Sequence, residues 1–195
     1  MSLFGLIRGF RSSDNTAQPL RLDRATNTLQ IIDYAHHEMH SGSHFFLSGH
    51  IDLAINHVLD FTMVTPNTTK WAHWLWKIDT KSETNWFVYE NAVITNPLAN
   101  SLTPFNNNRN SATASGLTFK YEDQANLAAA NADTDVTTAT VLESGISGAG
   151  KGAGFDSRVN EIILGQNKIY CLRAIATAAG YIDFFMSWYE HTDIA

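Results

Sequence analysis

The feature of this sequence that most constrains its fold is a series of short apolar runs, separated from one another by turn-forming residues. After residue 28 about eight or nine such runs follow in succession, and little helical periodicity intervenes. Strands in series without helices between them indicate an antiparallel sandwich or barrel. We therefore predict a mostly β fold, an antiparallel β-sandwich that is jelly-roll-like, with an extended or short-helical N-terminal arm.

The expected strands are runs that alternate apolar with polar residues or that are rich in β-branched and aromatic residues. The run Leu53–Met63 alternates with a period of two, which predicts one half-buried strand. Trp74 and Trp76 share one face of the next run, and we expect one of its two faces in the core. The other expected strands are 71–78, 85–90, 117–121, 136–142, 161–164, 169–175 and 181–189.

Two polar stretches are expected to be long loops. Residues 96–116 are rich in Asn, Ser and Thr, with Phe105 to Asn110 at their centre, and residues 144–154 are rich in glycine. Long irregular loops in a compact β domain usually contact partners or form mobile tips. Residues 125–132 are the only further helix candidate after the arm.

The composition narrows the possible partners. Charged residues make up 16% of the chain, which is below the roughly 25% of a typical soluble domain. Uncharged polar groups cost less to desolvate than charges, so such a surface suits packing against neighbouring subunits. The net charge of -6 argues against nucleic acid as a partner, and no apolar run approaches the ~20 residues of a membrane span. The apolar start also lacks the features of a secretory signal.

The first 25 residues differ from the rest of the chain. Their apolar residues are spaced to form one face of a short helix, with arginines beside it, and a polar stretch with turn chemistry follows. We predict an N-terminal arm and linker in residues 1–25 and a β-sandwich domain in residues 26–195. The alternative is a terminal helix that caps its own core.

Six histidines lie between residues 36 and 57, which raises the question of a metal site. His36 and His40 have the four-residue spacing that lets two imidazoles share one metal ion on a helix. On a strand, the same spacing would separate them by roughly 13 Å. We expect the cluster to make polar loop and sheet hydrogen bonds, and we predict no metal and no cofactor. A true metal site and a site between subunits are the alternatives. The six residues are His36, His37, His40, His44, His50 and His57.

No other motif indicates catalysis. The glycine-rich segment 145–152 nearly matches a phosphate-binding loop, but Gly152 follows Lys151 where a hydroxyl should hold magnesium. We expect a hairpin tip there instead. The single cysteine, Cys171, lies in an apolar run and is expected to be a buried small hydrophobe. We predict no catalytic residues.

Four blocks of the sequence together resemble a known group of proteins. The blocks are Ile32–Phe45, Thr65–His73, Tyr89–Glu90 with Phe105–Ser111, and Trp188–Thr192. They resemble small virion structural proteins of tailed bacteriophages, of the capsid decoration (cement) type. The resemblance covers roughly residues 28–193 and excludes the arm. It implies a β-sandwich particle component, often a trimer, and it carries over no catalytic residue.

The predicted function is that of a non-enzymatic virion protein on the capsid surface. It would decorate and stabilise the capsid through its arm and loops, with the major capsid protein and neighbouring copies of itself as partners in a homotrimer. The alternatives are a tail, baseplate or fibre component that binds a host receptor or glycan, and a metal-dependent hydrolase. For the glycan alternative, the candidate contacts are tryptophans that could stack on sugar rings if exposed: Trp71, Trp74, Trp76 and Trp86. The predicted partner-binding residues are Leu3, Phe4, Leu6, Ile7, Arg8, Phe10, Arg11, Phe105, Asn107 and Arg109.

Overall fold

The computed structural model describes residues 8–10, 17–19, 34–96, 98, 100–125, 134–155 and 157–192. By its internal contacts the chain divides into two units, residues 1–37 and residues 38–195. The predicted boundary between residues 25 and 26 lies outside the described residues, as does most of the helix candidate 125–132. In the part of the chain that is described, no helix is long and apolar enough to cross a membrane.

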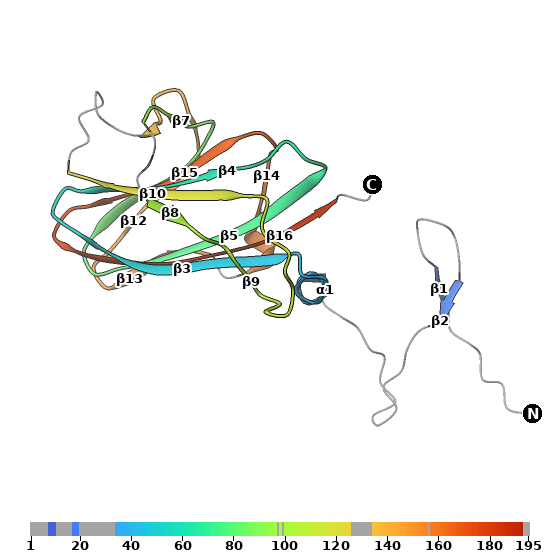
Figure 1. Ribbon diagram of the computed structural model, residues 1–195. Helices are drawn as coiled ribbons and strands as arrows, with labels where there is room; N and C mark the ends of the chain where they lie inside the picture. Colours follow the sequence, from blue (N-terminus) through green and yellow to red (C-terminus); the bar gives the residue numbers. More distant parts are fainter. Residues whose placement is uncertain are drawn as a thin grey trace, which may run out of the picture. The chain divides into compact units, whose positions relative to one another are not determined.

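The second unit is a sandwich of two six-stranded antiparallel sheets, which Figure 1 shows as stacked layers. The first, named here the β4 sheet, has the order β12 (Thr140–Ser147), β6 (Thr84–Glu90), β15 (Ile169–Ala176), β4 (Val58–Val64), β10 (Thr118–Gln124), β8 (Asn100–Leu102). The second, named here the β16 sheet, has the order β13 (Lys151–Gly154), β5 (Lys70–Thr80), β16 (Gly180–Thr192), β3 (His44–Leu53), β9 (Phe105–Asn106). Its sixth strand, β14 (Ile162–Leu164), follows the 3-10 turn Arg158–Asn160 and also pairs with β5.

Eight of these strands have jelly-roll connectivity. Successive strands of this set alternate between the two sheets, first from β3 to β6 and then from β12 to β16. The β16 sheet contains β3, β5, β13 and β16, and the β4 sheet contains β4, β6, β12 and β15. The resulting orders, β13-β5-β16-β3 and β12-β6-β15-β4, are those of two interlocked Greek keys. The predicted mostly β, jelly-roll-like sandwich is confirmed, and β8, β9 and β10 extend its sheets beyond β4 and β3.

The core lies between the inner faces of the two sheets. Trp74 and Trp76 are 0% and 1% exposed, so the face of β5 that they share is the core face. Trp188 packs on Phe119 and Phe45, with ring centroids 4.6 and 6.0 Å apart. Aromatic rings of this size bury 150–250 Å² each, so they supply much of the hydrophobic stabilisation of the sandwich.

Part of the outer face of the β4 sheet is covered as well. The ribbon of β7 (Val93–Ile94) and β11 (Thr134–Asp135) forms a separate two-stranded sheet, and β7 lies above the β4 sheet in Figure 1. Beneath it, Arg173 donates from Nε and Nη2 to the two carboxylate oxygens of Asp60, at 2.7 and 2.8 Å, and from Nη2 to the Thr134 carbonyl oxygen at 2.8 Å. Burial alone would lower the pKa of Arg173, but the hydrogen bonds and charge of Asp60 raise it. This ion pair therefore ties β4, β15 and β11 together.

Cys171 lies beside this ion pair and is completely buried, as predicted. Its sulfur is 3.5 Å from Asp60 Oδ1, and burial, together with that carboxylate, raises the pKa of the thiol well above its usual value. Since the thiolate is the reactive form, the native thiol should be inert. We expect iodoacetamide to label Cys171 only in denaturant, as measured by mass spectrometry, and rapid labelling of the folded protein would contradict the burial.

A strand prediction and a loop prediction were wrong. The run Leu53–Met63 is not one strand, because β3 ends at Leu53 and β4 begins at Val58. Between them Asn56 takes a left-handed conformation with φ of 62°, and its N–H donates to the Ala176 carbonyl oxygen. Asparagine tolerates this conformation better than most residues, which allows a tight turn without glycine. The predicted loop 144–154 is largely extended, since β12 and β13 leave only residues 148–150 between them.

The strand-like pattern expected from residue 28 is wrong at residues 34–41, which form helix α1 (Tyr34–Ser41). This segment contains no β-branched residue, glycine or proline, so nothing local opposes a helix. The helix ends at Gly42, whose φ is 77°. The Ser43 N–H donates to the Glu38 carbonyl oxygen and the Gly42 N–H to that of Met39, the pattern of a Schellman motif.

In the first unit, β1 (Arg8–Phe10) pairs with β2 (Ala17–Pro19) as an antiparallel ribbon. Arg8 and Phe10 therefore lie in a strand, which is the extended rather than the short-helical form of the predicted arm. The remaining predicted arm contacts lie outside the described residues: Leu3, Phe4, Leu6, Ile7 and Arg11.

Candidate functional site

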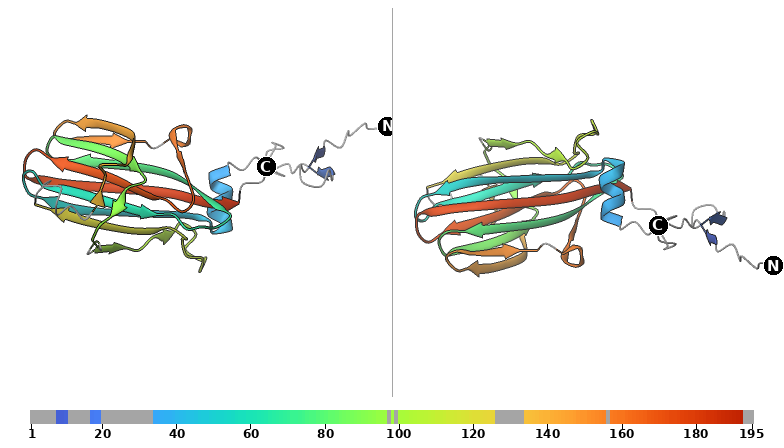
Figure 2. Two further views of the ribbon diagram at one scale, coloured as in Figure 1. Left: turned by 90° about the horizontal axis from the view of Figure 1, so that it is seen from above. Right: turned by 90° about the horizontal axis from the view of Figure 1, so that it is seen from below.

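The outer face of the β16 sheet carries an unusual number of aromatic side chains. Figure 2 (right) shows β3, β16 and β5 side by side, and alternate residues of each strand point away from the core. Tyr189 is paired with His44 on one side and His73 on the other, and Phe185 with Ser48 and Lys77. The exposed face of an antiparallel sheet normally carries polar residues, so this face departs from the usual pattern.

Three phenylalanines form one cluster on this face, named here the phenylalanine patch. Phe46 of β3 packs against Phe105 of β9 and Phe185 of β16, with ring centroids 5.7 and 6.4 Å apart. Phe105 and Phe185 remain 46% and 47% exposed. Because these exposed rings are contiguous, the patch is a candidate interaction surface.

Two predicted contact residues meet at this patch. The Arg109 guanidinium lies over the ring of Phe105, 5.5 Å from its centroid, in cation–π geometry. Both residues are exposed, and they lie at the edge of the β16 sheet beside β3. The structure therefore brings together Phe105 and Arg109 and adds Phe46 and Phe185, which the sequence did not identify.

Asparagines hold the loop that carries Arg109. Asn106 donates from Nδ2 to the carbonyl oxygens of Gly42 and Thr113, at 2.8 and 3.0 Å. The backbone N–H of Asn107 donates to the carbonyl oxygen of His44 at 2.9 Å. Asn107, predicted as a partner contact, is half-buried, and its backbone anchors the loop.

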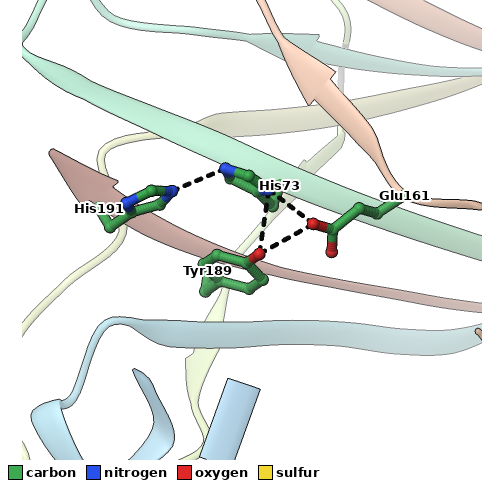
Figure 3. A network of polar contacts seen from close by, with 4 residues as sticks. All are labelled: His73, Glu161, Tyr189 and His191. Atoms are coloured by element: carbon green, nitrogen blue, oxygen red, sulfur yellow. Dashed lines mark hydrogen bonds and ion pairs between the residues drawn. The ribbon is translucent and has the colours of Figure 1, made fainter. Parts of the chain in front are cut away.

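At one end of the same face, four polar side chains form a connected network (Figure 3). His73 Nδ1 and the Tyr189 hydroxyl both lie within hydrogen-bonding distance of Glu161 Oε1, at 2.7 and 2.8 Å. His191 Nε2 faces His73 Nε2 at 2.7 Å. The rings of His73 and Tyr189 stack with centroids 4.5 Å apart and an interplanar angle of 15°. Neither histidine belongs to the cluster that the sequence singled out.

The histidines of that cluster do not converge on one point. His50 contacts Asp183 at 2.7 Å, and His57 contacts Asp123 at 2.7 Å, on different sheets. The hydrogen bond to Asp183 raises the pKa of His50 above its usual value. His36 and His40 lie on α1, so their spacing does place them on one side of a helix, contrary to the strand geometry expected. Among the described residues, no group of three or more His, Cys, Asp or Glu side chains is placed to hold a metal ion.

The glycine-rich segment is a turn between two strands. The Lys151 N–H donates to the Gly148 carbonyl oxygen, and the Ser147 hydroxyl donates to that of Lys151, each at 3.1 Å. Lys151 begins strand β13, whereas a phosphate-binding loop leads into a helix. This supports the interpretation of a tip between strands rather than a nucleotide site.

Comparisons with known protein families, curated proteins and solved structures find no match to this chain. The similarity to phage virion proteins therefore stays a prediction from the four sequence blocks. The strand order independently establishes the jelly-roll architecture, but one architecture of this kind hosts many functions.

Proposed function

We propose that the chain is a non-enzymatic virion structural protein that decorates and stabilises the capsid of a tailed bacteriophage. The observation that carries the docking part of this proposal is the phenylalanine patch, exposed on the outer face of the β16 sheet. The virion part rests on the four sequence blocks. The partners are the major capsid protein and neighbouring copies, arranged as a homotrimer.

The chemistry of the patch suits a protein partner. Aromatic residues and arginine are enriched at the centres of protein interfaces, where Lys, Glu and Asp are depleted. Here Arg109 covers one face of Phe105, so it is preorganised to be buried with the ring. Around the rings, Ser48 and Ser187 contribute small uncharged side chains to the same sheet face. A partner surface that buries the patch therefore needs an acceptor for Arg109, whereas the two serines add no charge to desolvate.

The arm supports the same proposal through its charge. Residues 1–25 contain four Arg and two Asp, a net charge of +2, so residues 26–195 carry the remaining -8 of the total of -6. A basic, apolar arm on an acidic domain is suited to hold an acidic neighbour, whether a capsid subunit or another copy.

Capsids that lack the protein provide the test. We expect Phe105→Asp and Phe185→Asp to lower occupancy on capsids at least tenfold, since each places a charge in the buried interface. Deletion of residues 1–20 should abolish binding while the domain stays folded. Ile146→Asp is the matched control, because Ile146 is 69% exposed on β12 of the other sheet. Quantitative gel analysis of purified capsids measures the occupancy. Equal occupancy for all four variants would contradict the proposal.

A tail, baseplate or fibre component that binds a receptor glycan is the second candidate. Trp71 favours it, since this ring is 37% exposed and lies beside His191 on the outer face, where a sugar could stack. Trp86 does not contribute. It packs edge-on against Trp76 at 5.0 Å and lies directly over Gly145, where an added Cβ would be 2.6 Å from the ring. Electron micrographs that place the protein on the tail would favour this candidate.

A further inference from the structure

We propose that the free edge of strand β3 binds an extended, basic segment of the partner protein, which pairs with β3 as an added strand. The inference rests on the docking part of the proposed function, because β3 also carries Phe46 of the phenylalanine patch. It names how the partner is held, by backbone hydrogen bonds along β3 in addition to contacts at the patch. Proteins with an open sheet edge commonly recognise extended peptides in this way.

One side of β3 has a neighbouring strand along only part of its length. On one side, β16 pairs with β3 from His44 to Leu53. On the opposite side, β9 pairs only with Phe45 and Phe46. Within the described part of the chain, the stretch Leu47–Leu53 therefore has no strand on this side. We name this stretch the β3 edge.

Hydrogen bonds at the start of β3 show which backbone groups point toward this edge. The Glu190 N–H donates to the Ser43 carbonyl oxygen, so Ser43 faces β16. The Asn107 N–H donates to the His44 carbonyl oxygen, so His44 faces the other way. Successive residues of an antiparallel strand alternate between its two sides in this respect. The N–H and C=O groups of three exposed residues therefore point outward along the β3 edge: Ser48, His50 and Asp52.

The β3 edge lacks the features that usually keep edge strands from pairing with other chains. Those features are lysine or proline in the strand, β-bulges and very short length. The stretch Leu47–Leu53 contains neither residue, and its pairing with β16 has no register shift. The long edge strand β12, by contrast, has an irregular register between Val141 and Glu143. Of these two long edges, the β3 edge is therefore better suited to accept an added strand.

The inner side of the sandwich is also incomplete beside β3. Past β4, the β4 sheet continues with β10 and β8, whereas the β16 sheet continues past β3 only with the two-residue strand β9. In Figure 1, β10 lies in the layer above β3. Three apolar residues of β3, β8 and β10 are only partly buried against the core: Ile51, Leu102 and Tyr121. An added strand with apolar residues on its inner face would cover part of their surface.

The charge on the outer face indicates a basic occupant. Neither β3 nor β16 contains Lys or Arg. Carboxylate oxygens of Asp52 and Asp183 lie 3.4 and 2.7 Å from the ring nitrogens of His50, and the Asp52 side chain is 87% exposed. A Lys or Arg of the added strand opposite Asp52 would therefore meet a carboxylate. At the other end of the edge, an apolar side chain beside Ser48 would extend the phenylalanine patch beyond Phe105.

Amide hydrogen exchange, measured by NMR on the isolated full chain, tests the pairing. The probe is a synthetic peptide of about seven residues that alternates valine with lysine, which fits the length and charge of the edge. We expect the peptide to slow exchange at Ser48, His50 and Asp52 at least about tenfold, because its backbone then binds these N–H groups. The N–H groups of Gly49 and Ile51 face β16, so their exchange should change little. A peptide with glutamate in place of lysine is the control and should bind at least about tenfold more weakly.

A proline variant tests the same edge from the side of the protein. Ser48→Pro removes an outward N–H and places a ring against the incoming strand, so it should weaken binding of the lysine peptide at least about tenfold. Proline is tolerated on an edge strand where the N–H faces solvent, and circular dichroism checks that the variant folds. The matched control is Ser144→Pro, which changes an exposed serine on β12, the edge strand at the far side of the other sheet. It should keep the affinity.

Four results would overturn the inference: no binding of the lysine peptide, unchanged affinity in Ser48→Pro, protection without the alternation, or protection of these amides in the free monomer. Protection that appears only on dimerisation, seen by analytical ultracentrifugation, would also overturn it, since the occupant would then be a second copy. Failure of the proposed function is a separate result. Peptide binding at the β3 edge together with capsid occupancy that is unchanged by Phe105→Asp and Phe185→Asp would remove the patch and leave the strand site.

Discussion

Replacing Arg173 with methionine is expected to lower the free energy of unfolding by about 3–5 kcal/mol. The substitution removes two hydrogen bonds to Asp60 and one to the Thr134 carbonyl oxygen. Asp60 is 0% exposed, so its carboxylate would be left buried without a counter-charge. Removing one member of a buried ion pair costs more than the pair itself contributes, because the remaining charge stays desolvated.

Urea denaturation followed by tryptophan fluorescence measures this effect. The control is the double variant Asp60→Leu/Arg173→Met, which replaces both charges by apolar side chains of similar size. We expect it to recover most of the loss, since apolar replacement of a whole buried ion pair is often neutral or stabilising. A single variant that loses less than about 1 kcal/mol would mean that water reaches Asp60.

Replacing Gly154 with alanine is the second large expected effect, about 3 kcal/mol of destabilisation. Gly154 has a φ of 106°, a conformation that side chains rarely adopt. An added Cβ would overlap the carbonyl oxygen of Trp76 and lie 2.8 Å from Cα of Lys77. Both are backbone atoms of the neighbouring strand β5, so no side chain can turn away to relieve the overlap.

The same segment supplies two graded controls. Gly150 has a φ of 70° with nothing within 4 Å of an added Cβ, so Gly150→Ala should cost only about 1–2 kcal/mol of conformational strain. At Gly148 the atom nearest to an added Cβ is 3.9 Å from it. Gly148→Ala should therefore change the free energy of unfolding by less than about 0.5 kcal/mol. Thermal unfolding of the three variants should follow this order. If all three variants lost the same free energy of unfolding, neither the positive φ nor the steric overlap would explain the loss. The greater backbone entropy of glycine relative to alanine would then account for it.

The sequence predicted the strands that carry dense aromatic and β-branched residues, such as those that became β5, β6, β15 and β16. It did not predict the turn after Leu53, because Asn56 ends the strand without glycine or proline and the alternation continues across it. It also could not place α1, since three of its eight residues are histidines, and these give no apolar periodicity.

The candidate site was only partly predictable for a different reason. Phe105 and Arg109 were identified because they stand out in a polar loop. Phe185 lies in a strand with aromatic residues on both faces, so nothing local says which face is the core. Its contact with Phe46 depends on the register between β16 and β3, which only the folded sheet defines. The same register brings His73 and His191 together.

The position of β16 has a consequence for how the chain reaches this state. This last described strand lies in the middle of its sheet, between β3, the first strand of the sandwich, and β5. Until β16 has been synthesised, β3 and β5 have no partner between them and the core residues Met186 and Trp188 are missing. Folding of this sheet must therefore wait for residues 180–192, as in other β proteins dominated by distant contacts, which fold in milliseconds to seconds. During synthesis the unpaired edges of β3 and β5 would be exposed to other nascent chains.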